Sequence, residues 1–176
     1  MYDSTVTYLD EPAGTLAIGH LAQPRIEPEI VLHFKRAPRA TADERELLLR
    51  VDWIAHGYEI VQSHFPNWTF RAADAIAAFG LHGALVVGPK QPIDELADVV
   101  RKLRTFTITL AKDGKVEADG RPFAEWPAVP AVVRANTGGR VGDHGTLTSP
   151  APIRAGETWH TELSGIGLPG LQLHLT

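Results

Sequence analysis

Charged and apolar side chains alternate along residues 23–30, QPRIEPEI, and this stretch constrains the fold more than any other. Successive side chains of a β-strand point to opposite faces, at about 3.3 Å of rise per residue. A strand here places Arg25, Glu27 and Glu29 on one face and the two isoleucines on the other. The two glutamates then lie about 6.6 Å apart along the strand, close enough for their side chains to converge on one ion.

Two interpretations of this charged face remain open from the stretch alone. The first is a solvated sheet face on which Arg25 pairs with a glutamate, a common arrangement in open sheets. The second is a cavity in which carboxylates hold a divalent cation such as Mg²⁺, which takes oxygen ligands. Pro28 has no N–H to donate to a neighbouring strand, so we expect this strand to lie at a sheet edge or to open out there.

A cation site needs a further ligand, and Glu59 is the candidate. It lies in Tyr58-Glu59-Ile60-Val61, where every neighbour is large and apolar. A glutamate in such a strand is costly unless it is paired, protonated or bound to metal. The alternative is an outward-facing residue on a half-exposed strand.

Composition limits the other classes of function. The chain has 176 residues, a formal net charge of -4 and no cysteine. This length predicts a single domain over residues 1–176, and the charge gives no basic footprint for nucleic acid. Without cysteine there are no disulfides and no thiolate ligands, which fits a cytoplasmic location. No apolar run approaches the roughly 20 residues of a membrane span, and we expect no membrane partner.

The remaining pattern predicts an α+β fold in which strands dominate and a few helices flank them. We expect a β-hairpin within residues 1–20, a helix from Thr41 that stops at Gly57, and helices near residues 70–79 and 93–101. Further strands are expected at residues 58–61, 84–87, 105–110, 159–163 and 171–175, with a turn at 112–115. Residues 121–144 show weak periodicity and several prolines and glycines.

Other catalytic arrangements find little support. The eight histidines are scattered, with no H-x-x-x-H or H-x-H pair, so a zinc site is not expected and most are interpreted as surface or core residues. There is no G-x-S-x-G nucleophile elbow and no glycine-rich phosphate loop.

Four motifs occur in a defined order: residues 23–30, then His56-Gly57-Tyr58-Glu59-Ile60-Val61, Asp74 within ADAIA, and Gly145-Thr146-Leu147-Thr148. Together they resemble the fumarylacetoacetate hydrolase superfamily, in its branch of 2-keto-4-pentenoate hydratases and 2-oxo-acid decarboxylases. The resemblance covers most of residues 1–118 and 145–176. It implies a mixed β-roll of the fumarylacetoacetase C-terminal type.

The resemblance also implies a site. By position, Glu27, Glu29 and Glu59 match the family's metal carboxylates for Mg²⁺ or Mn²⁺. Asp74 matches an acid beside the site, although it could equally be a solvated acid on its helix. Arg25 is assigned to substrate binding. Thr146 lies where family loops approach the substrate, with ordinary turn chemistry as the alternative.

The implied reaction is addition of water to a short unsaturated 2-keto acid such as 2-keto-4-pentenoate, in aromatic catabolism. Decarboxylation or C–C hydrolysis would use the same metal chemistry. Relatives carry further sequence before the part that matches Met1, including a glycine-flanked lysine linked to proton transfer, and residues 121–144 diverge from the family pattern. A catalytically impaired partner subunit is therefore a third hypothesis. A homo-oligomer, or association with a decarboxylase or hydratase partner, is also expected.

Overall fold

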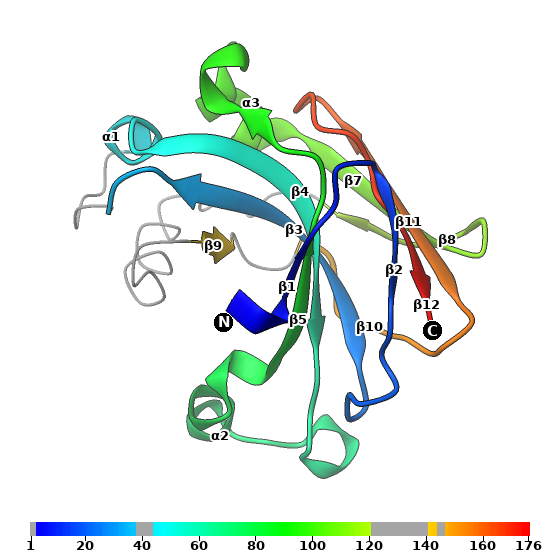
Figure 1. The fold of residues 1–176 in the computed structure, drawn as a ribbon. Helices are drawn as coiled ribbons and strands as arrows, with labels where there is room; N and C mark the ends of the chain where they lie inside the picture. Colours follow the sequence, from blue (N-terminus) through cyan, green and yellow to red (C-terminus); the bar gives the residue numbers. More distant parts are fainter. Residues whose placement is uncertain (1–2, 38–43, 121–140, 144–146) are drawn as a thin grey trace.

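Two sheets packed face to face form the molecule in the computed structural model, which describes residues 3–37, 44–120, 141–143 and 147–176 (Figure 1). The first sheet has the order β1-β5-β4-β3-β10, with β6 paired to β4 and β9 paired to β3. Its strands are β1 Val6–Tyr8, β3 Arg25–Phe34, β4 Val51–Val61, β5 His82–Val87, β6 Gln91–Pro92, β9 Val141–Asp143 and β10 Ala151–Pro152.

The second sheet has the order β2-β12-β11-β7-β8. Its strands are β2 Ala13–Leu16, β7 Thr107–Lys112, β8 Lys115–Gly120, β11 Thr158–Ser164 and β12 Gln172–Leu175. The hairpin of β7 and β8 turns at residues 112–115, as the sequence predicted. Strands also lie at the two predicted C-terminal positions, where β11 pairs with β12 antiparallel. The α+β class with strands in the majority is confirmed.

The helices are short and lie mostly at the ends of the strands rather than between the sheets. In the described chain they are α1 Glu44–Leu48, α2 Ala72–Ala77 and α3 Val99–Thr105, with 3₁₀ helices at Asp3–Thr5, Pro66–Trp68, Phe79–Leu81 and Ile93–Glu95. In Figure 1, α2 and α3 lie at opposite ends of the sheets. None of the described helices is long and apolar enough to cross a membrane.

The main core fills the space between the sheets. Ile26, Tyr58 and Ile60 of the first sheet pack against Trp159 and Leu173 of the second. A neighbouring cluster around Ile30, Leu32 and Ile108 extends this core. The even-numbered apolar side chains of β3 therefore point inward, as the alternation predicted. The odd-numbered face of β3 points away from the second sheet.

Two predictions about the elements were wrong. The helix expected from Thr41 to Gly57 ends at Leu48, and the rest of that run belongs to β4. Since β4 is buried on both faces, its apolar residues do not alternate with polar ones, and their spacing also fits a helix. The described residues 3–20 form no hairpin, because β1 pairs in parallel with β5 and β2 pairs in parallel with β12.

The strand carrying the two glutamates opens out as expected at Pro28. On one side β3 pairs continuously with β4. On the other side β10 pairs with residues 25–26 and β9 with residues 31–33, so residues 27–30 lie in the gap between them. Of the segment predicted to diverge, residues 121–140 and 144 lie outside the described part, as does Thr146.

Candidate metal centre

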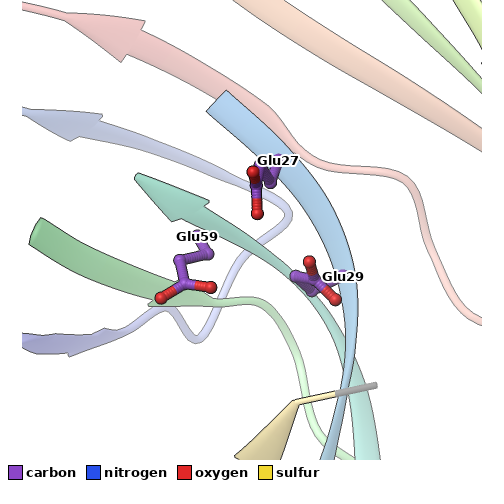
Figure 2. A group of neighbouring side chains, drawn as sticks. All are labelled: Glu27, Glu29 and Glu59. Atoms are coloured by element: carbon purple, nitrogen blue, oxygen red, sulfur yellow. The ribbon is translucent and has the colours of Figure 1, made fainter. Parts of the chain in front are cut away.

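The register of β3 and β4 brings three carboxylates together. Glu27 lies directly opposite Glu59, and Glu29 lies opposite Gly57. Because alternate residues share a face, all three acidic side chains project from the outer face of the first sheet. Figure 2 shows their carboxylates turned toward a common space, with Glu27 and Glu29 from one strand and Glu59 from the next.

These carboxylates are close to one another and largely shielded from solvent. One oxygen of each lies within 4.8 Å of the others. Glu29 is 1% exposed, and Glu27 and Glu59 are partly buried. Three like charges at this separation repel one another, and burial removes the water that would screen them. A hard divalent cation neutralises such a set and prefers oxygen ligands, so the donor set fits Mg²⁺ or Mn²⁺.

Gly57 keeps the strands close together beside this cluster. A Cβ at Gly57 would lie 2.8 Å from the carbonyl oxygen of Val86 and 2.9 Å from Cγ2 of Val31. Both are closer than real Cβ contacts allow, and the first neighbour is backbone that cannot move aside. The glycine that the sequence predicted as a helix stop is therefore a close-packing position in the middle of β4.

His82 contacts Glu59 from the start of β5. Its Nδ1 lies 2.6 Å from Oε1 of Glu59, and its Nε2 lies 2.8 Å from Oγ1 of Thr5. The side chains of His82 and Glu59 are only 6% and 13% exposed. A carboxylate oxygen only accepts, so Nδ1 donates to it.

A second histidine fixes the backbone at Glu29 from the inner face. His56 is fully buried; its Nδ1 lies 2.8 Å from the carbonyl oxygen of Glu29, and its Nε2 lies 2.7 Å from Oγ1 of Thr161. Burial lowers the pKa of His56 to about 4, so the ring is neutral near pH 7. Nδ1 therefore donates to the Glu29 carbonyl, and the Thr161 hydroxyl donates to Nε2.

The same network ties the two sheets together. The hydroxyl of Tyr58 donates to the carbonyl oxygen of Leu171 at 3.0 Å, and the N–H of Leu171 donates to Oγ1 of Thr161 at 3.1 Å. Burial raises the pKa of Tyr58 above its usual range. Every polar group here has a partner, so the network stabilises the core and holds β3 in place.

The predicted substrate residue Arg25 lies on the same face as Glu27, two positions along β3. Its guanidinium lies 4.1 Å from the ring centroid of Trp68, a cation–π contact. Trp68 is held in turn, because its Nε1 donates to the carbonyl oxygen of Gln23 at 3.0 Å. The structure thus places a fixed positive charge at one end of the carboxylate face.

Asp74 lies on α2 and is not among the three carboxylates that the structure brings together. Its Oδ2 accepts a hydrogen bond from the backbone N–H of Arg71 at 2.8 Å, which caps the first turn of this short helix. Its assignment as an acid beside the site stays a prediction. Thr146 lies outside the described residues.

Sequence reasoning missed the contributions of His82, Thr5 and His56. Histidines without ligand spacing were interpreted as surface or core residues, and only the second description fits His56. The partners of His82 are 23 and 77 residues away in the chain. The spacing of residues along the sequence does not predict such contacts, because they depend on the pairing of β4 with β5 and of β1 with β5.

Comparison with known proteins gives similarity along nearly the whole chain. No protein-family model matches. A 2-hydroxyhexa-2,4-dienoate hydratase from Comamonas testosteroni is 28% identical over 180 residues, which cover 96% of this chain and 67% of that protein.

Solved structures share the fold. The 4-oxalocrotonate decarboxylase from Pseudomonas putida G7, complexed with magnesium and adipate, superposes with a TM-score of 0.78 at 16% identity, over 99% of this chain and 67% of that one. Fumarylpyruvate hydrolase from Pseudomonas aeruginosa, in complex with Mn²⁺ and pyruvate, superposes with a TM-score of 0.69 at 16% identity, over 98% and 75%.

Proposed function

We propose that this chain is a member of the fumarylacetoacetate hydrolase superfamily, and that it is a divalent-metal-dependent hydratase that adds water to a short unsaturated 2-keto acid. A 2-keto-4-pentenoate-like compound from aromatic catabolism is the substrate class. The convergence of Glu27, Glu29 and Glu59 carries the proposal. The similarity to a dienoate hydratase over 96% of the chain supports the choice of reaction.

The three glutamates are the proposed ligands of Mg²⁺ or Mn²⁺. A bound divalent cation supplies Lewis-acid polarisation of a 2-keto carbonyl, which stabilises the negative charge that develops when water adds to the conjugated double bond. The chain supplies the rest of the environment. β3 and β4 hold the ligands in register, and His56 holds the backbone of Glu29 in place.

Arg25 is the proposed partner for the substrate's carboxylate. It lies on the face of the glutamates, and stacking on Trp68 fixes its guanidinium. We propose Asp74 and Thr146 as further residues beside the substrate, on the resemblance alone. Because the reaction needs proton transfer as well as charge stabilisation, turnover is a separate requirement from metal binding.

A second candidate reaction is decarboxylation of a 2-oxo acid. It is favoured by the likeness to the 4-oxalocrotonate decarboxylase, which has the higher TM-score of the two solved structures described. The same polarised carbonyl would accept, through a conjugated double bond, the electron pair left when carbon dioxide departs from a carboxylate at the far end of the substrate, so the ligands serve either reaction.

Two measurements test these proposals. Calorimetric titration of metal-free protein with Mn²⁺ should give one binding event per chain. Glu29→Gln should weaken that event at least about 100-fold, because it removes a buried anionic ligand. Glu162→Gln is the matched control, since Glu162 is exposed on β11 of the other sheet. Wild-type protein that gives no heat with millimolar Mn²⁺ would reject the metal site.

The reaction is then identified with a panel of short 2-keto acids in the presence of Mn²⁺. Loss of the conjugated chromophore without release of carbon dioxide indicates hydration, whereas release of carbon dioxide indicates decarboxylation. Metal binding without any turnover on the panel would contradict both reactions and favour the partner-subunit hypothesis.

A further inference from the structure

A break in the β4–β5 ladder puts His82 on the same face as the glutamates. Glu59 pairs with Leu85 and Ile60 with Ala84, but Val61 pairs with His82, so Gly83 is an extra residue in β5. Such a β-bulge shifts the alternation of faces by one and redirects a side chain. Without it, His82 would point to the opposite face of the sheet from Glu59.

Gly83 suits this bulge for a steric reason. A Cβ at this position would lie 2.8 Å from the carbonyl oxygen of Ile60 and 3.2 Å from Cδ2 of Leu21. The first contact is with backbone, so a larger residue would force the two strands apart. Gly83 therefore permits the bulge, and the bulge turns the side chain of His82 toward the glutamates.

The redirected imidazole is held at both nitrogens. Nδ1 donates to Oε1 of Glu59 at 2.6 Å, while Nε2 lies 2.8 Å from Oγ1 of Thr5, just before β1. A hydroxyl can donate to a ring nitrogen or accept from it, so Thr5 holds the ring whichever role Nε2 takes. Both side chains of the His82–Glu59 pair are nearly buried, which strengthens the hydrogen bond.

We propose that His82 is a positioning residue for the metal centre, and that it orients the carboxylate of Glu59 so that its other oxygen, Oε2, faces the cation. This inference rests on the proposed metal site. With Oε1 engaged by the imidazole, Glu59 binds through one oxygen. Thr5 fixes the ring from the N-terminal segment, and the site therefore depends on three strands of the sheet, β3, β4 and β5, and on the residue that leads into β1.

The physical role is to oppose the repulsion among the glutamates. Glu59 lies directly opposite Glu27, and without a donor its carboxylate would rotate away from its neighbours. A donor fixed by its own partner keeps the ligand in place before the cation arrives. Removal of such an outer partner of a metal ligand typically weakens metal affinity 10–100-fold.

Calorimetric Mn²⁺ titration of His82 variants tests the proposal. His82→Phe keeps a ring and removes both nitrogens, and its Mn²⁺ affinity should fall about 10–100-fold. His82→Asn places an amide N–H close to the position of Nδ1, and its affinity should stay within about threefold of wild type. Thr5→Val should weaken binding less than His82→Phe, and Thr5→Ser should restore it. His174→Phe, on exposed His174 in β12, is the control and should bind as wild type.

Spectroscopy and unfolding separate positioning from a general loss of structure. The EPR spectrum of bound Mn²⁺ should broaden or change its splitting in His82→Phe and resemble wild type in His82→Asn. Thermal unfolding of each metal-free variant checks that it is folded. If His82→Phe does not fold, the comparison of His82→Asn with Thr5→Val and Thr5→Ser carries the test.

The outcomes distinguish this inference from the proposed function. Wild-type protein that binds Mn²⁺ with His82→Phe binding equally well overturns the positioning role alone. A His82→Asn variant as weak as His82→Phe also overturns it, since the donor would not be what matters. Wild-type protein that fails to bind Mn²⁺ overturns the metal site and this inference with it.

Discussion

The two faces of strand β4 differ in charge: the inner face carries neutral, hydrogen-bonded side chains, and the outer face carries a glutamate close to two others. On the inner face, His56 and Tyr58 are neutral, buried and hydrogen-bonded to the second sheet and to β3. On the outer face, Glu59 lies among like charges beside Gly57. The inner face is arranged for stability. The outer face brings like charges together, which costs stability and is typical of a functional site.

The largest expected effect comes from breaking the inner network with His56→Leu. This variant leaves the carbonyl oxygen of Glu29 and Oγ1 of Thr161 without their imidazole partner in the core. Each lost buried partner costs roughly 1–3 kcal/mol, so we expect the free energy of unfolding to fall by about 2–4 kcal/mol. Urea denaturation of metal-free protein measures it. A loss below about 0.5 kcal/mol would show that the network contributes no stability.

Acid should weaken the same face without a mutation. Burial lowers the pKa of His56 to about 4 in the folded protein, against 6.5 for the free side chain. Between these values the unfolded chain binds a proton that the folded chain excludes, so this contribution to stability is complete above pH 6.5 and is lost as pH falls to 4. At about 1.36 kcal/mol per pH unit, the loss approaches about 3 kcal/mol.

Denaturant titrations of metal-free wild type and His56→Leu between pH 7 and pH 4 isolate this effect. The wild-type curve should be steeper than that of the variant, because both share every other titrating group. Parallel curves would contradict the burial of a neutral imidazole at this position.

The outer face should respond to metal and the inner face should not. Mn²⁺ at about 100 times its Kd should add about 2.7 kcal/mol to the free energy of unfolding of the wild type. The same addition should add at most about 0.4 kcal/mol to Glu29→Gln, because its affinity is expected to be at least about 100-fold lower. Tyr58→Phe, which alters only the inner face, should keep the full increment although its own baseline is lower. A lost increment in Tyr58→Phe would mean that the two faces are coupled.

The smallest effect has the opposite sign. Glu27→Gln removes one of two like charges that lie directly opposite each other on β3 and β4. Such pairs are destabilising by roughly 0.2–1 kcal/mol, so the metal-free variant should be more stable than wild type by about this amount while it binds Mn²⁺ more weakly. Urea denaturation in a chelator measures the gain, with Glu162→Gln as the control. A loss of stability would show that the charges on the outer face are not in conflict.

Sequence patterns predicted β3 and the set of acidic side chains because both depend on local rules. Alternation with a period of two in residues 25–32 fixes which side chains share a face, and the structure brings Glu27, Glu29 and Glu59 together as expected. The order of the motifs indicated the resemblance to the fumarylacetoacetate hydrolase superfamily, whereas the pairing of β3 with β4 came from the structure.

Other features depend on partners distant in the sequence and were not predictable from local patterns. The first half of β4 was interpreted as helix because a strand buried on both faces shows no alternation. The N-terminal strands were interpreted as a hairpin, although their parallel partners lie about 79 to 159 residues away, as Val6 with Leu85 and Gly14 with Leu173 illustrate. His82 was overlooked because it lies before the strand predicted at residues 84–87, and the extra residue in β5 that directs its side chain has no signal in the local sequence.

The opposition of Glu27 and Glu59 across two paired strands means that hydrogen-bond register, rather than loop shape, sets the spacing of this site. A single-residue deletion that shifts the register of β3 by one would turn Glu27 and Glu29 toward the apolar core between the sheets. The same shift would turn Ile26 and Ile30 outward. Lengthening a surface loop leaves the pairing of β3 with β4 unchanged. Such a scaffold tolerates insertions and deletions in its loops, and these changes can alter which substrate binds. Insertions and deletions in β3 or β4 would disrupt the site that holds the ion.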